Sequence, residues 1–138
     1  MEPESRLARV VRKRLKQMAL DFEISLLESA CKDSYDNFNL LFHLGNAYTK
    51  GGRYAEGLRI DERLCSLAPE NPVVHYNLAC SLSLLGKIDE SLAALQKSLE
   101  LGYSEFQFIR SDPDTENARR NSRFEKILER FEKKMGKA

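Results

Sequence analysis

The stretch that decides the fold is residues 38–71, FNLLFHLGNAYTKGGRYAEGLRIDERLCSLAPEN, together with the stretch that follows it directly, residues 72–105, PVVHYNLACSLSLLGKIDESLAALQKSLELGYSE. Shifting the chain by 34 residues overlays the first stretch on the second. The residues that match are mostly apolar residues and glycine: Leu44 falls on Leu78, Gly52 on Gly86, Leu58 on Leu92 and Leu67 on Leu101. The chain therefore contains an internal repeat, and a period of this length indicates stacked copies of one supersecondary unit.

Each repeat has the pattern of two helices joined by a turn. Leu41, Leu44 and Tyr48 are spaced by three and four residues, which places them on one face of a helix. Gly52 supplies the turn after the first helix, and Pro69 ends the second. No segment alternates apolar and polar residues over the length of a strand between turn signals. We therefore predict an all-α fold in which helix pairs stack, because one pair cannot bury its own apolar face.

Several features of residues 38–71 belong to one family pattern. They are the motif Leu41-x-x-Leu44-Gly45-x-x-Tyr48, the turn Gly52-Arg53-Tyr54, the small residue Gly57 and the closing Pro69. With these residues the stretch resembles a tetratricopeptide repeat (TPR). It departs from that family at Leu41, where tryptophan is usual, and at Asp61, where an aromatic residue is usual. Residues 72–105 resemble a second copy, in which Tyr103 replaces the closing proline.

The resemblance implies a TPR-like right-handed helical-hairpin array, an α-α superhelix, with about three helix pairs plus a C-terminal capping helix. Residues 1–138 would form a single domain, similar to small bacterial TPR domains, with repeats at 38–71 and 72–105. Gly45 and Ala79 would lie where the two helices of a pair cross. Axes about 8–10 Å apart leave no room for a bulky side chain at that point.

Residues 4–37 fit two alternatives, a degenerate repeat or an N-terminal helix. Apolar residues recur at helical spacing over residues 5–32, and no glycine or proline occurs between Pro3 and Gly45. A degenerate repeat would turn at residues 18–21, with Asp21 as the N-cap of its second helix. Otherwise residues 5–32 form one long helix. We favour the degenerate repeat.

Residues 106–138 are expected to form a partial repeat and a capping helix. Asp112 can cap a short helix that has Pro113 at its first position. Ser122 and Glu125 have the spacing of a capping box. The apolar residues that follow lie on one helix face and would cover the exposed end of the stack: Phe124, Ile127, Leu128 and Phe131.

Composition limits the classes of protein to consider. The chain has 138 residues, of which 42% are hydrophobic and 31% charged, as in ordinary globular domains. It has neither an apolar run of transmembrane length nor the apolar region of a signal peptide.

The three cysteines form no CxxC pair, and free thiols suit a reducing compartment, so we expect a cytoplasmic protein. Because no phosphate loop, nucleophile motif or metal-ligand spacing occurs, we expect neither an enzyme nor a bound cofactor or metal.

The family resemblance implies that the first helices of the pairs line a concave groove, which binds an extended peptide or a partner helix. Carried over by position, the groove residues are Arg12, Lys16, Asn39, Phe42, Asn46, Thr49, Lys50, Val73, Tyr76, Asn77, Cys80 and Ser83. Phe42 and Tyr76 would be exposed aromatic anchors. The side-chain amides of Asn46 and Asn77 would hold a peptide backbone. The predicted function is therefore that of a protein-interaction module or adaptor.

Charge is distributed unevenly behind the net value of +1. Residues 1–20 carry +4, residues 21–118 carry −8 and residues 119–138 carry +5. The basic ends fit solvated faces, an acidic protein partner or, with least support, nucleic acid, since no aromatic residues alternate with the basic ones. Arg12, Lys16 and Lys50 would favour acidic ligands. The alternative function is a scaffold that self-associates through the amphipathic N-terminal helix, so the chain is expected to be a monomer or a weak homo-oligomer.

Overall fold

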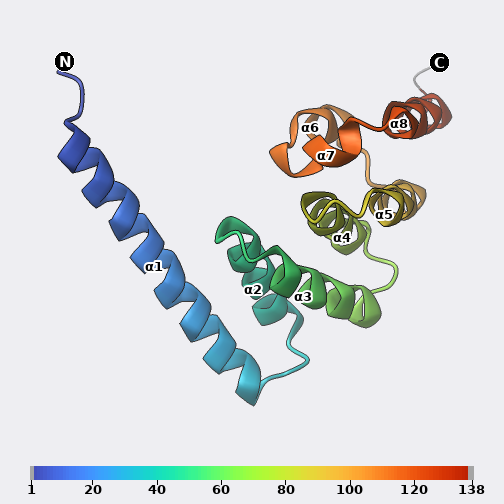
Figure 1. Ribbon diagram of the computed structural model, residues 1–138. Coiled ribbons are helices and arrows are strands. Elements are labelled where there is room, and N and C mark those ends of the chain that lie inside the picture. Colours follow the sequence, from blue (N-terminus) through green and yellow to red (C-terminus); the bar gives the residue numbers. More distant parts are fainter. Residues whose placement is uncertain (1, 137–138) are drawn as a thin grey trace.

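Helices account for all regular structure in the computed structural model, which describes residues 2–136 (Figure 1). In chain order they are α1 (Arg6–Asp33), α2 (Phe38–Lys50), α3 (Tyr54–Leu67), α4 (Pro72–Leu84), α5 (Ile88–Glu100), α6 (Phe106–Ser111), the 3-10 helix η1 (Pro113–Thr115), α7 (Glu116–Arg119) and α8 (Ser122–Lys134). No strand occurs within the described range, so the all-α prediction is confirmed. Residue 1 and residues 137–138 of the predicted domain lie outside that range.

The two internal repeats form two matching helical hairpins, α2 with α3 and α4 with α5, and α3 packs in turn on α4. Each first helix starts at an asparagine, Asn37 or Asn71, whose side-chain oxygen accepts a backbone N–H at 3.1 Å and 2.9 Å respectively. Gly52 and Gly86 follow the first helices with φ angles of +75° and +76°, a region that favours glycine. The repeat register read from the sequence therefore reproduces the turns of both hairpins, and the predicted helical-hairpin array is confirmed.

Gly45 allows α2 and α3 to cross closely. A Cβ atom at this position would lie 3.1 Å from Cγ2 of Ile60 and 3.2 Å from Oδ1 of Asp61. Both distances are shorter than ordinary van der Waals contact, and Ile60 is β-branched and has little freedom to move aside. The crossing therefore favours a small residue, as the sequence predicted, and leaves no room for a bulky side chain.

The hairpin favoured for residues 4–37 is wrong, because α1 is a single helix of 28 residues. Ser5 caps it by accepting the N–H of Ala8 at 3.1 Å. Asp21, expected to cap a second helix, instead accepts a hydrogen bond at 2.9 Å from the side chain of Gln17 within the same helix. Residues 18–21 contain no residue that ends a helix, so nothing interrupts the run.

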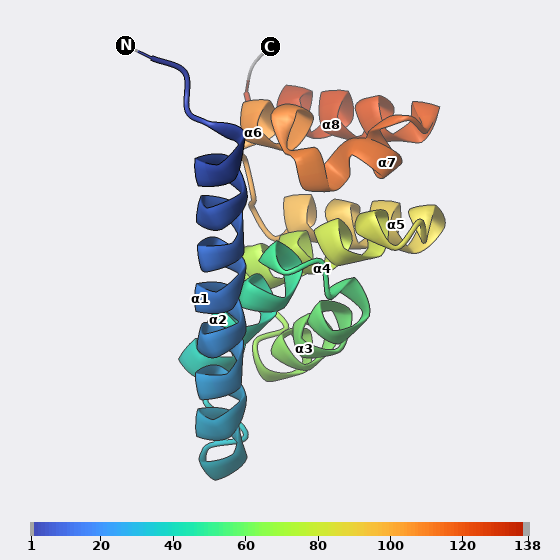
Figure 2. The same ribbon diagram turned by 60° about the vertical axis from the view of Figure 1, so that its left-hand side comes forward.

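The C-terminal half of α1 attaches this helix to the rest of the molecule. The apolar residues that pack with α2, α3 and the start of α4 are Leu20, Ile24, Leu27 and Cys31. The hydroxyl of Tyr48 donates a hydrogen bond of 2.6 Å to Glu28. Residues 6–19 are all exposed, and in Figure 1 this half of α1 diverges from the body of the molecule. In Figure 2 α1 runs along one edge of the molecule, with α2 directly behind it.

The C-terminal segment covers the open end of the stack as expected. Phe124, Leu128 and Phe131 are buried on α8 and complete the core formed by α4 and α5. Asp112 caps η1 by accepting the N–H of Asp114 at 3.0 Å, as predicted. The capping box at Ser122 is wrong, because the preceding residue, an asparagine, is the N-cap and Ser122 is already helical.

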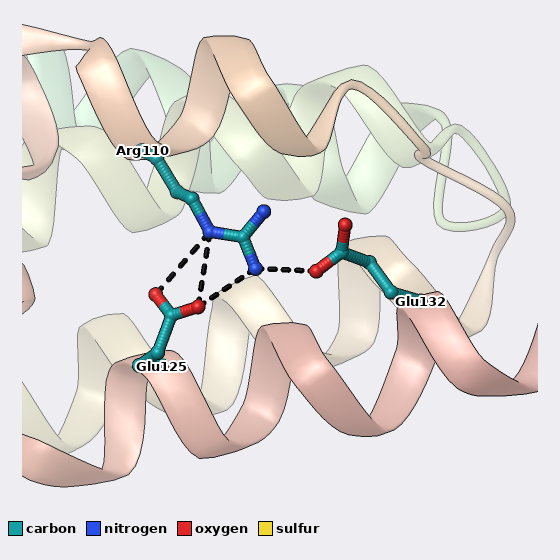
Figure 3. A network of polar contacts seen from close by, with 3 residues as sticks. All are labelled: Arg110, Glu125 and Glu132. Atoms are coloured by element: carbon teal, nitrogen blue, oxygen red, sulfur yellow. Dashed lines mark hydrogen bonds and ion pairs between the residues drawn. The ribbon is translucent and has the colours of Figure 1, made fainter. Parts of the chain in front are cut away.

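Glu125 is not available for a capping box because it pairs with Arg110 of α6 (Figure 3). Arg110 donates to one oxygen of Glu125 at 3.0 Å from Nε and at 2.7 Å from Nη2, and Nη2 also reaches Glu132, further along α8. These hydrogen bonds raise the pKa of Arg110 further above its ordinary value. The cluster thus ties α6 to α8 across the end of the array.

Among the described residues, no helix is both apolar enough and long enough to span a lipid bilayer.

Replacement of Gly45 by leucine should abolish the cooperative thermal unfolding transition measured by circular dichroism. The added side chain would force α2 and α3 apart at their crossing. The matched control is Ala55→Leu on the exposed side of α3, which should melt like the wild type. An unchanged melt of the Gly45→Leu variant would contradict the close crossing.

Replacement of Arg110 by methionine should lower the free energy of unfolding by about 1 kcal/mol, because it removes a charge-assisted connection between α6 and α8. Urea unfolding in low and high salt measures this, and the loss should shrink in high salt because exposed ion pairs are screened. Arg120→Met, which breaks a more exposed pair with Glu116, is the control with a smaller expected effect. Equal losses for the two variants would contradict a structural role for the cluster.

Candidate functional site

A pocket of about 330 Å³ opens on the face formed by the first helices α2, α4 and α6. Side chains from all three helices line it, together with one residue of α3 and residues that follow α5 and α6. The lining residues are Asn46, Thr49, Lys50, Asp61, Val73, Tyr76, Asn77, Cys80, Ser81, Tyr103, Phe108, Asp112 and Asp114.

Seven of the twelve groove residues expected from the sequence lie in this lining: Asn46, Thr49, Lys50, Val73, Tyr76, Asn77 and Cys80. The other five do not line the pocket. Asn39 and Phe42 are on α2 outside it, and Arg12 and Lys16 are exposed on α1. Ser83 is fully buried, and its hydroxyl accepts the N–H of Ala118 at 3.1 Å, so its placement in an open groove is wrong.

The aromatic residues differ from the exposed anchors that were expected. Tyr76 is only 3% exposed and forms part of the pocket wall, where its ring stacks on Tyr103 with centroids 4.6 Å apart. Phe42 is half-buried and stacks on Phe38 at 6.0 Å. Phe108, which the sequence did not single out, is 51% exposed beside Tyr76 and lines the pocket. Tyr76 is therefore a buried part of the pocket wall, whereas Phe108 is an exposed aromatic side chain of the lining.

A buried carboxyl group reaches the pocket from α3. Asp61 is 4% exposed, and its side chain lies beside Gly45, whose missing side chain leaves space for it. The hydroxyl of Ser81 donates a 2.5 Å hydrogen bond to Asp61 Oδ2. Burial raises the pKa of Asp61 to about 7, the nearby Glu62 adds to this rise, and the hydrogen bond from Ser81 opposes it. The group therefore changes its charge near neutral pH.

Two further carboxyl groups, those of Asp112 and Asp114, line the pocket. Asp112 accepts hydrogen bonds from the Tyr76 hydroxyl at 2.6 Å and from the Cys80 thiol at 3.9 Å. Burial, and then the charge of Asp112, raise the pKa of Cys80 well above its ordinary value, which keeps the thiol protonated. The same two causes raise the pKa of Asp114.

The lining therefore contains three carboxyl groups and one amine, that of Lys50. Of the three basic residues that were expected to favour acidic ligands, only Lys50 lines the pocket. The basic side chains of Arg12 and Lys16 belong to the exposed half of α1. The pocket is thus acidic, although the whole chain carries a net charge of +1.

Sequence reasoning did not include Asp61, Tyr103 or Asp112 among the site residues. Two of them stand at departures from the family pattern, Asp61 in place of an aromatic residue and Tyr103 in place of the closing proline. Asp112 was expected to cap a helix, and its Oδ1 atom does so. Its Oδ2 atom also accepts a hydrogen bond from the hydroxyl of Tyr76. Departures from the repeat pattern were therefore the signal that could have located the pocket.

The two histidines lie outside the pocket. His43 is exposed on α2, and His75 makes a 2.8 Å hydrogen bond to the carbonyl oxygen of Pro69 through Nε2. Over residues 2–136, no group of three or more histidine, cysteine or acidic side chains is placed to hold a metal ion.

Replacement of Asp61 by asparagine should stabilise the protein more at pH 8 than at pH 5, by about 2 kcal/mol. The folded protein keeps the Asp61 proton up to about pH 7, whereas an unfolded aspartate loses its proton near pH 4, so burial of this group destabilises the fold increasingly as pH rises between these values. Asparagine keeps an oxygen for Ser81 and does not ionise. Urea unfolding at both pH values measures the difference.

The matched control is Glu62→Gln, which removes the neighbouring but exposed carboxylate and should change stability little at either pH. An Asp61→Asn variant with the same stability change at pH 5 and pH 8 would contradict a raised pKa.

The comparisons with known proteins agree with the geometry of the hairpins. A sequence profile described as tetratricopeptide repeat matches residues 73–101, which extend from α4 to the end of α5. The chain is 37% identical over 91 residues to a chloroplastic protein of Arabidopsis thaliana, a match that covers 64% of this chain and 27% of that protein. It is 40% identical over 48 residues to "TPR repeat-containing thioredoxin TTL4" of the same plant, covering 35% of this chain and 7% of that protein.

The chain thus spans about a quarter of the length of the first of these relatives and far less of the second. Among solved structures it is similar to "MamA MSR-1 C2", with a TM-score of 0.65 and 22% identity, covering 88% of this chain and 72% of that one. A second structure, "MamA RS-1 ArsTM double mutant", has a TM-score of 0.63 and 16% identity, covering 87% and 70%. At these identities the likeness shows the fold alone.

Proposed function

Because the chain belongs to the tetratricopeptide repeat family, we propose that it is a protein-interaction module whose pocket between α2, α4 and α6 receives a lysine or arginine side chain of a partner. The observation that carries this proposal is the group of carboxyls that line the pocket, one of which, Asp61, is buried. The role is one of binding, without a catalytic step.

A buried carboxyl that costs stability is more easily understood as part of a binding site than as part of a core. The raised pKa of Asp61 means that the empty pocket holds this group largely protonated just below neutral pH. A cationic side chain brought within a few ångströms would favour the ionised form and gain a charge-assisted hydrogen bond. Asp112 and Asp114 also line the pocket and add negative potential.

The rest of the lining suits the other parts of a peptide. The ring of Phe108 and the side chain of Val73 are exposed, and they offer apolar surface to the methylene groups of lysine or arginine. The side-chain amides of Asn46 and Asn77 offer donors and acceptors to a peptide backbone. Arg12 and Lys16 lie on the exposed half of α1, away from the pocket. We propose separately that these two residues attract acidic segments of a partner.

The compartment also stays a prediction. Cys31, Cys65 and Cys80 are free thiols, which suit the cytosol or another reducing compartment. The name of one relative places that protein in the chloroplast, and we propose only that this chain works where thiols stay reduced.

The pocket is tested with blocked heptapeptides that carry lysine, arginine or glutamate at the centre of a Gly-Ser background. Titration into isotope-labelled protein, followed by NMR, should shift the amides around Asn77 and Phe108 with the two basic peptides and not with the acidic one. Dissociation constants of about 0.1–10 mM are expected for such short ligands. Stronger binding of the glutamate peptide would overturn the proposal.

Affinity for the lysine peptide should increase as pH rises from 6 to 8, because less free energy is then needed to ionise Asp61. Asp61→Asn should weaken binding about tenfold at pH 8, equivalent to about 1.4 kcal/mol, and should remove most of the pH dependence. Glu62→Gln is the matched control and should bind like the wild type. An Asp61→Asn variant with wild-type affinity at both pH values would remove Asp61 from the site.

A further inference from the structure

The free side of α1 carries a continuous apolar stripe that the acidic pocket does not use. Its residues, with their exposed fractions, are Leu7 (74%), Val11 (49%), Leu15 (59%), Met18 (61%), Phe22 (66%) and Leu26 (55%). Large apolar side chains exposed in a continuous row are uncommon on monomeric proteins and mark interaction surfaces. Val10, 55% exposed, widens the stripe near its N-terminal end.

The stripe lies on the opposite side of α1 from the body of the molecule. Successive residues of a helix are about 100° apart, so Met18 and Phe22 point roughly opposite to Ile24 and Leu27, which pack against the rest of the chain. In Figure 1 the other helices all lie to one side of α1, which leaves the opposite side open. A partner on the stripe would therefore not collide with the body of this molecule.

The steps between successive residues of the stripe follow the same order when they are read from either end. Its steps are four, four, three, four and four residues, with the midpoint between Lys16 and Gln17. A second α1 laid antiparallel about this midpoint would place apolar residues opposite apolar residues along the whole stripe. The facing pairs would be Leu7 with Leu26, Val11 with Phe22, and Leu15 with Met18 of the other copy. Steps of four, four and three repeat every eleven residues, close to the natural helical period, so the two helices stay nearly straight.

Charge along α1 favours the same antiparallel arrangement. The N-terminal half carries six basic residues between Arg6 and Lys16, whereas residues 21–33 carry four acidic residues and one lysine. Because the two-fold axis brings each flank of the stripe against the same flank of the other copy, an antiparallel neighbour would place Arg12 near Glu23 and Arg14 near Asp21 of that copy. Within one copy Arg12 and Asp21 make only exposed contacts, Arg12 with Glu4 at 2.7 Å and Asp21 with Gln17 at 2.9 Å. A parallel neighbour would instead place the six basic residues of both copies side by side.

From this stripe and its charge pattern, we propose that a second copy of this chain packs antiparallel against α1, forming a two-fold symmetric dimer. The contact would run for about 30 Å along each helix and bury on the order of 1,000 Å² in total. That area is at the low end of specific interfaces, so a dissociation constant of about 1–100 µM is expected. The surface is separate from the pocket, and each can be present without the other.

Sedimentation velocity of the full chain from about 1 µM to about 500 µM tests the dimer. The wild type should pass from monomer to dimer within this range. Met18→Glu places a charge at the centre of the stripe and should weaken the dimer at least tenfold. Gln17→Glu introduces the same charge at the neighbouring position, off the stripe, and should leave the dimer nearly unchanged. Circular dichroism of both variants checks that α1 stays helical.

The orientation is tested by disulfide formation between engineered cysteines. In a mixture of Val11→Cys and Phe22→Cys chains, a disulfide should form between residue 11 of one chain and residue 22 of the other. Val11→Cys chains alone should not crosslink to one another. The wild type, whose own cysteines are mostly buried, gives the background.

A wild type that stays monomeric at every concentration would overturn the dimer and leave the stripe to a different occupant. Equal dimerisation of the Met18→Glu variant would overturn the stripe as the interface. Crosslinking of Val11→Cys chains to one another would overturn the antiparallel arrangement. None of these results alters binding of the lysine peptide, so failure of the dimer and failure of the pocket are distinguishable.

Discussion

At Gly45 the helices α2 and α3 approach so closely that one added carbon atom would lie 3.1 Å from the side chain of Ile60. This contact fixes the geometry of the first hairpin, and with it the position of α3 against α4. It also brings Asp61 of α3 through to the face of the first helices, where Ser81 of α4 hydrogen-bonds it. The same missing side chain thus serves the packing of the hairpin and supplies the pocket with its buried carboxyl.

The sequence predicted the parts of the fold that repeat. Gly52 and Gly86 end the first helices with nearly equal φ angles, and Asn37 and Asn71 cap them, because these positions are governed by local backbone chemistry. The single helix α1 was the less favoured of two alternatives because apolar residues lie on both of its sides. One side packs on the body and the other is exposed, a pattern that resembles two short helices when only spacing is read.

The site was harder to predict, because its chemistry comes from contacts between distant residues. Tyr76 fits the pattern of an exposed groove aromatic, yet it is buried because Asp112 and Tyr103, far along the chain, pack over it. The acidic character of the pocket depends on Asp61, Asp112 and Asp114 meeting in space, which charge counts over segments do not reveal. Conversely, the basic N-terminal segment stands clear of the pocket on α1, so the near-zero net charge conceals two surfaces of different sign.

The unsupported half of α1 gives this molecule a mechanical property. A helix is stiff over a few turns, and residues 6–19 extend for about 20 Å beyond the last apolar contact with the body. A force applied at the tip of such an arm acts as a torque on the junction formed by Leu20, Ile24 and Tyr48, which is also where α2 ends and the first turn begins. A force that a binding partner exerts on the N-terminal end of α1 is therefore transmitted by the stiff helix to the first hairpin, α2 and α3.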